Sequence, residues 1–110
     1  MEIRDIPFRV IDWTALEPET HPGESGTSLW RTVESGVFRV RLVEYSPGYR
    51  SDHWCPRGHI FFVFEGEFGV LLKNGESHLL RPGMSFLAPD DAANPHLGFS
   101  DTGAKAFIVD

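Results

Sequence analysis

Hydrophobic and polar positions alternate over short stretches of this chain, and no window keeps the helical spacing of apolar residues for as long as ten residues. Strands are therefore predicted, separated by turns rich in glycine and proline. One helical turn is expected over residues 13–17, a loop over 21–26, and a hairpin turn at Asn74-Gly75. Strands at such regular intervals indicate an all-β sandwich or barrel. The predicted strands span residues 7–12, 27–33, 37–45, 59–72 with a bend or bulge at Gly66, 77–80, 84–88, 95–100 and 104–109.

The stretch from Ile60 to Phe64 is apolar on both of its faces. On a strand, His59, Phe61, Val63 and Glu65 share one face, and the other face carries Ile60, Phe62 and Phe64. A barrel of this size has only one interior, so the second face must meet N-terminal strands or another subunit. We therefore expect a homodimer, formed through the face of Ile60, Phe62 and Phe64 or by exchange of the N-terminal strand.

Composition narrows the class of protein. The chain has 110 residues, of which 41% are hydrophobic, and its nine phenylalanines suffice for one core. Its net charge of −6 argues against nonspecific binding to nucleic acid or to an anionic membrane. No apolar stretch approaches the roughly 20 residues of a membrane helix. A single cysteine excludes an internal disulfide, and residues 1–5 do not resemble a signal peptide, so a cytoplasmic protein is expected.

That single cysteine lies among histidines. His53, Cys55 and His59 occur within seven residues, and His96 follows the later turn at Pro82-Gly83. Imidazole and thiolate are the usual ligands of zinc, iron and copper. A spacing of two puts His53 and Cys55 on the same face of a strand, and the turn over 56–58 lets His59 face them. The pattern predicts a metal site inside the barrel.

These residues resemble the two sequence motifs of the cupin superfamily. The first motif is a Pro-Gly turn, His-x-His, a glutamate and an aromatic strand, and the second is Pro-Gly, a further proline and a histidine. In this chain the first motif corresponds to Pro47-Gly48, His53-x-Cys55, His59 in the place of the glutamate, and residues 61–66. The second corresponds to Pro82-Gly83, Pro89 and His96, with a loop before His96 that is about two residues longer than usual.

The resemblance covers residues 37–110, which would form the core barrel, with 1–36 added as N-terminal strands and loop. Residues 1–110 would then be a single cupin domain. Asp52-His53-Trp54-Cys55 is similar to the motif of the small single-domain group named after Asp-His-Cys-Trp. The resemblance implies a double-stranded β-helix, or jelly-roll barrel, that binds a metal. It implies no particular reaction, because that group has none assigned.

The ligand set departs from the common cupin set of three histidines and one glutamate. A thiolate and a third imidazole make it softer, which favours zinc or iron, with copper or nickel as alternatives, over manganese. Four protein ligands would close a tetrahedral zinc site, the structural pattern. Three histidines with Cys55 turned away would leave a position open, and six-coordinate ferrous iron would leave two.

Three functions remain open. The first is a metal-dependent enzyme, dioxygenase-like, acting on a small organic substrate; no separate base or nucleophile stands out, so no catalytic residue is assigned. The second is a non-catalytic domain that binds or senses a small molecule and has a closed zinc site. The third is a metal-free structural relic. Fold alone does not choose among them.

Three charged residues near the predicted site have two interpretations each. Asp52 could orient His53 as a hydrogen-bond acceptor or simply form a turn. Arg39 and Arg41 could bind an anionic ligand, although cross-strand pairing with glutamate is the expected role.

Overall fold

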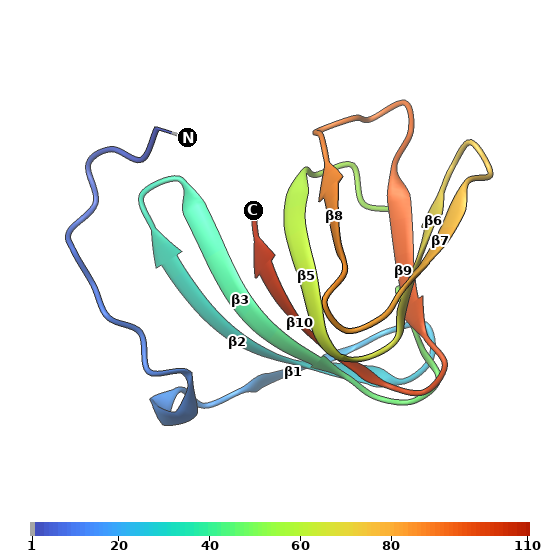
Figure 1. Ribbon diagram of the computed structural model, residues 1–110, viewed down its shortest axis with the longest axis horizontal. Coiled ribbons are helices and arrows are strands. Elements are labelled where there is room, and N and C mark those ends of the chain that lie inside the picture. Colours follow the sequence, from blue (N-terminus) through green and yellow to red (C-terminus); the bar gives the residue numbers. More distant parts are fainter. Residues whose placement is uncertain (1) are drawn as a thin grey trace.

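The computed structural model describes residues 2–110, which form ten strands and one short 3-10 helix (Figure 1). Over these residues the chain forms no helix with the length and apolar character that crossing a membrane requires. The elements are the helix η1 (Trp13–Ala15) and the strands β1 (Glu19–Pro22), β2 (Thr27–Ser35), β3 (Phe38–Tyr45), β4 (Tyr49–Arg50), β5 (His59–Gly66), β6 (Phe68–Leu72), β7 (Ser77–Leu80), β8 (Ser85–Ala88), β9 (His96–Ser100) and β10 (Ala104–Val109).

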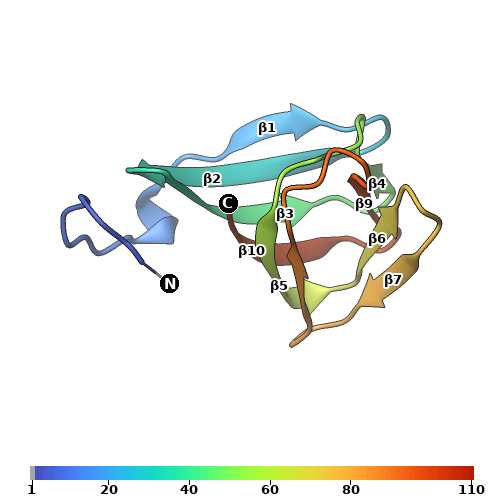
Figure 2. The same ribbon diagram turned by 90° about the horizontal axis from the view of Figure 1, so that it is seen from above.

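The strands form two antiparallel sheets that face each other. The larger sheet has the order β1-β2-β3-β10-β5-β8, and the smaller has the order β4-β9-β6-β7 (Figures 1 and 2). Neighbouring strands of a sheet are often distant in the sequence, as β3 and β10 are. The larger sheet therefore combines strands from the beginning, the middle and the end of the chain. The predicted all-β jelly-roll barrel, a double-stranded β-helix, is confirmed.

The core lies between the sheets. Alternate residues of β3, β5 and β10 point inward, because successive side chains of a strand face opposite sides. Each fully buried valine, isoleucine or phenylalanine contributes about 1.5–3 kcal/mol through removal of apolar surface from water. The buried cluster consists of Val43, Phe61, Val63, Phe68, Val70, Leu80, Ala104, Ala106 and Ile108.

The bend predicted within residues 59–72 is where the chain changes sheets. β5 ends at Gly66 in the larger sheet, and β6 begins at Phe68 in the smaller one. Gly66 has φ +73°, a left-handed conformation that favours glycine. A Cβ atom at this position would lie 2.1 Å from the carbonyl oxygen of Gly103, so the backbone itself fills the space.

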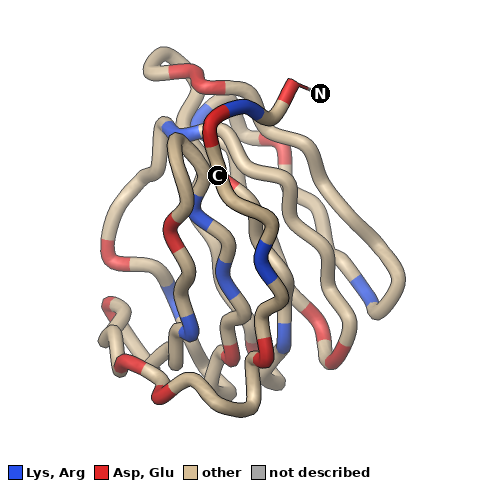
Figure 3. The backbone as a smooth tube through the Cα atoms, turned by 90° about the vertical axis from the view of Figure 1, so that its left-hand side faces the viewer, with Lys and Arg blue, Asp and Glu red and all other residues tan. Residues whose placement is uncertain are grey.

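Charged residues are dispersed over the strands. Figure 3 shows acidic and basic residues interspersed rather than gathered in one region. Lys105, for example, lies 3.2 Å from Glu44 and 3.0 Å from Glu65 on neighbouring strands. Such exposed pairs contribute about 0–1 kcal/mol each. They therefore add little to the stability of the sheet.

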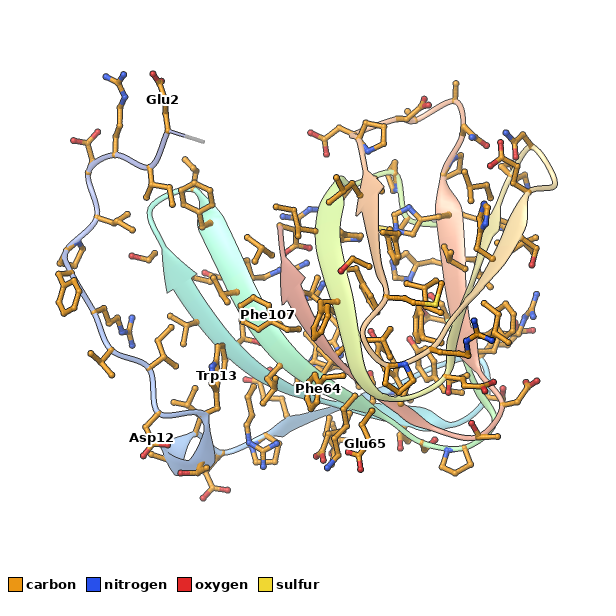
Figure 4. The ribbon with its side chains drawn as sticks, viewed as in Figure 1. Glu2, Asp12, Trp13, Phe64, Glu65 and Phe107 are labelled. Carbon is orange, nitrogen blue, oxygen red and sulfur yellow. The ribbon has the colours of Figure 1, made fainter. Side chains whose placement is uncertain are left out.

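The N-terminal segment differs from the prediction in two places. Residues 7–12 form no strand, because they lie beside no sheet edge with which their backbone groups could pair. His21 and Pro22, expected in a loop, instead belong to β1, where they pair with Ser28 and Thr27 of β2. The helical turn is confirmed as η1, whose first residue, Trp13, packs edge-on against Phe107 at 6.3 Å (Figure 4).

Candidate metal centre

Three potential metal ligands converge inside the barrel. The ligand atoms of Cys55, His59 and His96 all lie within 4.8 Å of one another. The Cys55 Sγ atom is 3.5 Å from Nε2 of His59, and the rings of His59 and His96 meet edge-on with centroids 4.9 Å apart. All three residues are half-buried.

Each ligand is positioned by a different element. His59 is the first residue of β5 and shares its inward face with Phe61 and Val63. His96 is the first residue of β9, in the opposite sheet. Cys55 lies in a loop, but its N–H donates to the His96 carbonyl at 2.7 Å, and the His96 N–H donates back at 3.0 Å. This backbone pair fixes the thiol beside the imidazole.

The second ring nitrogen of His59 faces a buried carboxylate. Its Nδ1 atom is 2.9 Å from Oδ2 of Asp110, whose side chain is only 1% exposed. This Nδ1 atom has no hydrogen-bond partner among the described residues, so the pair is a close polar contact. Metal-binding histidines commonly have a carboxylate behind them, which orients the ring. Here that arrangement leaves Nε2 of His59 turned toward Cys55.

His96 is held in its neutral form. Burial, and secondly the neighbouring His59, lower the pKa of His96 to about 4. Desolvation disfavours the charged imidazolium, and a second positive charge nearby disfavours it further. At neutral pH His96 therefore offers a free nitrogen lone pair, as a metal ligand must.

Asp110 also binds two arginines of the inner face of β3. Arg39 donates to it at 2.9 and 2.7 Å, and Arg41 at 3.2 Å. The expected pairing of these arginines with cross-strand glutamates is thus wrong. Both point into the barrel, and backbone hydrogen bonds between Arg39 and Asp110 bring the carboxylate beside them. Burial alone would raise the pKa of Asp110, but the hydrogen bonds from Arg39, the close contact with His59 and the arginine charges hold it well below its usual range.

His53 lies outside the cluster. Residues 51–58 form a loop rather than a strand, so the face that His53 was expected to share with Cys55 does not exist. Its side chain is 69% exposed, and its Nδ1 atom lies 2.7 Å from Oδ1 of Asp52. The hydrogen bond with His53 lowers the pKa of Asp52. His53 nevertheless lines the same cavity as the cluster, and its role as a fourth ligand stays a prediction.

Two cavities border the cluster, and Cys55, Phe86 and His96 line both. One, the arginine cavity, measures about 240 Å³ and has Arg39, Arg41 and Arg57 in its wall. The other, the apolar cavity, measures about 400 Å³ and has no arginine or lysine in its wall. Its apolar wall consists of Val70, Leu72, Leu79, Leu80, Met84, Phe86, Leu87, Ala88 and Pro89.

The donor set fits a transition metal. One thiol and two imidazoles match the ligand preferences of zinc and ferrous iron better than those of manganese. A tetrahedral zinc ion about 2.3 Å from sulfur and about 2.0–2.1 Å from nitrogen holds those two atoms about 3.5 Å apart. The separation between Cys55 Sγ and His59 Nε2 has this value.

Comparison with known proteins agrees on the fold. No protein-family model matches the chain. No curated protein matches its sequence. Among solved structures, it is similar to an RmlC-like cupin from Shewanella frigidimarina, with 18% identity, a TM-score of 0.74, and coverage of 94% of this chain and 90% of that one.

Two further structures extend this similarity. A cupin-superfamily sugar phosphate isomerase from Silicibacter pomeroyi is 20% identical, with a TM-score of 0.64 over 92% of this chain and 74% of that one. The Cnp3 cupin domain of Schizosaccharomyces pombe is 12% identical, with a TM-score of 0.68 over 89% and 69%. The chain therefore has the cupin fold, as its sequence motifs predict.

Proposed function

We propose that this protein is a metal-binding cupin in which Cys55, His59 and His96 hold one divalent transition metal. Zinc or iron is the expected ion, with copper or nickel as alternatives. The convergence within 4.8 Å of three donors, two from facing sheets and one from the loop before β5, carries this proposal. The carboxylate of Asp110 behind His59 supports it further.

A site with three protein ligands favours chemistry over a purely structural role, because the remaining position is open to water or substrate. Two cavities reach the cluster, so a small molecule has room beside it. A bound ion would polarise a substrate oxygen or activate water there. We propose a metal-dependent enzyme acting on a small organic substrate, dioxygenase-like if the ion is iron.

The alternative is a non-catalytic binding or sensing protein with a closed zinc site. His53 distinguishes the two, since it lines the arginine cavity and could become a fourth ligand only by turning its ring away from Asp52. Metal lost with His53 would favour the closed site. Metal kept without it would favour the open, catalytic site.

The test is elemental analysis of untagged protein purified without added metal. The wild type should contain nearly stoichiometric metal, which Cys55→Ala and His96→Ala should largely lose, because a ligand is missing. His78→Ala is the matched control, because His78 is an exposed histidine of β7 that lines the apolar cavity but lies outside the ligand cluster. Circular dichroism would establish that each variant is folded. Metal absent from the wild type, or equal in all variants, would overturn the proposal.

We also propose that the protein is a cytoplasmic homodimer. Its one cysteine is free, which suits a reducing compartment. Apolar side chains remain exposed on the outer face of β5, at Ile60, Phe62 and Phe64. A second copy of the chain would cover them.

A further inference from the structure

We propose that the arginine cavity beside the metal centre binds the oxyanion group of a small organic ligand, a carboxylate or a phosphate. This inference rests on the proposed function in one respect, because it names the substrate class of that same site. The anion-binding groups themselves are arginines and exist with or without a metal.

The cavity has an excess of positive charge. Three arginines line it, Arg39, Arg41 and Arg57, and none of the described residues in its wall is acidic. Asp110 lies against Arg39 and Arg41 and can neutralise only one of the three charges. Glu34 of β2 lies opposite Arg39 of β3 in the strand pairing, but its side chain is exposed to solvent and does not line the cavity. An anion entering the cavity would offset the remaining positive charge, a carboxylate in part and a phosphate more fully.

Arg41 carries an unused donor within this cavity. Its side chain is only 7% exposed, and one of its terminal nitrogens, Nη2, donates to Asp110. Its Nε atom is buried and has no hydrogen-bond partner among residues 2–110. Because a buried donor without a partner is costly, such groups in native proteins usually face a ligand or water. Burial also lowers the pKa of Arg41, but a guanidinium remains charged at neutral pH.

Trp30 holds the free donor of Arg41 in place. Trp30 lies under the guanidinium of Arg41 at 4.3 Å and under that of Arg39 at 5.6 Å. Asp110 occupies Nε and Nη2 of Arg39 and one N–H of Arg41, so the unpartnered donor is Nε of Arg41. Contact with an aromatic face leaves the N–H edge of a guanidinium group available. Arg41 is therefore ordered for a charge-assisted hydrogen bond to an oxyanion.

The rest of the ligand would lie toward the metal centre. Cys55 and His96 line both the arginine cavity and the apolar cavity. An anionic group held by the arginines would direct an uncharged or apolar body past the cluster. Because the protein as a whole has a net charge of −6, this local positive site stands out from its surroundings.

The test is isothermal titration calorimetry with benzoate, its neutral analogue benzamide, and inorganic phosphate, at low ionic strength. Wild-type protein should bind benzoate or phosphate and not benzamide. Arg57 is exposed at the cavity mouth, so Arg57→Gln should fold normally and weaken anion binding roughly three- to tenfold. Arg81→Gln, an exposed arginine outside the cavity, makes the same charge change and should leave binding unaltered.

Arg41→Lys tests the buried donor directly, because it keeps the charge and removes the unpartnered Nε–H. It should weaken binding of benzoate more than Arg57→Gln does. Each titration is run on protein as purified and after chelation, with the metal content measured. Anion binding that depends on Arg41 and Arg57 in metal-free protein supports the inference even where the proposed metal function fails. Benzamide binding as well as benzoate, or anion binding equal in all variants, would overturn it.

Discussion

At the scale of single residues, Asp110 determines the charge and orientation of the site. Its carboxylate contacts Arg39, Arg41 and Nδ1 of His59 within 3.2 Å. One buried anion thus holds two cations in place and turns one candidate metal ligand. Removing one partner from such a buried group leaves uncompensated charge, which is much more costly than losing an exposed pair.

We predict that Asp110→Asn lowers the free energy of unfolding by about 3–5 kcal/mol at pH 7, because Arg39 and Arg41 lose their buried counter-charge. Urea denaturation followed by circular dichroism measures this loss. Asp101→Asn is the control, because Asp101 is exposed, and it should change stability by less than about 0.5 kcal/mol. Similar values for the two variants would show that the Asp110 cluster has no special role.

We also predict that the stability difference between wild type and Asp110→Asn depends on pH. The pKa of Asp110 is depressed in the folded protein, so its contribution to stability is complete above the unfolded value of about 3.9. It is lost progressively as the pH falls below that value. The stability difference between wild type and Asp110→Asn should therefore shrink between about pH 4 and pH 2. His96 titrates in both proteins and largely cancels, and a difference that does not change with pH would contradict the assignment.

The sequence identifies residues well where strand alternation holds. His59 and Phe61 point inward, as their positions in a strand require. The inward row of β10 includes Ala104, Ala106 and Ile108, so the same alternation extended by two residues would have found Asp110. The alternation fails for His53, because residues 51–58 are a loop. Where side chains point there depends on backbone pairing with β9, which is distant in the sequence.

At the scale of elements, strands with clear alternation and flanking turns are predictable. β7 and β10 have the predicted bounds. β4 was missed because it has two residues and exists only through pairing of Tyr49 and Arg50 with β9. The prediction of a strand over 7–12 was wrong. Apolar residues form no strand unless their backbone can pair with the edge of a sheet, and this segment has no such partner.

We predict that Gly66→Ala is more destabilising than Gly75→Ala. Both glycines have positive φ, so each alanine costs about 1–2 kcal/mol in backbone conformation. Only at Gly66 would the added methyl meet backbone, at Gly103 and Ala104, whereas nothing lies within 4 Å of that position at Gly75. The collision should add about 1–3 kcal/mol. Thermal and urea unfolding of both variants measure the difference, and equal losses would contradict a close approach at the β5–β6 junction.

At the scale of the whole molecule, two apolar surfaces lack a cover within the described chain. On the outer face of β5, Ile60, Phe62 and Phe64 remain 41%, 38% and 40% exposed. In the N-terminal segment Phe8 is 96% exposed. Figure 4 shows Trp13, at the end of that segment, on the same side of the larger sheet as Phe107. The segment therefore ends beside the outer face that a second copy would cover, and exchange between subunits would bury both surfaces.

We predict that the wild type is a dimer in size-exclusion chromatography with light scattering, and that Phe62→Glu is a monomer, because a charge cannot be buried at the centre of an apolar interface without a partner. Val37→Glu is the matched control, because Val37 is an equally apolar residue, 90% exposed in the turn between β2 and β3. It should remain a dimer.

A variant lacking residues 2–11 distinguishes an interface through the face of β5 from exchange of the N-terminal segment. It stays dimeric only if the face of β5 suffices. Metal content should be the same in all four proteins, because the ligands lie inside the barrel. A monomeric wild type would overturn the dimer, and a monomeric Val37→Glu variant would place the interface elsewhere.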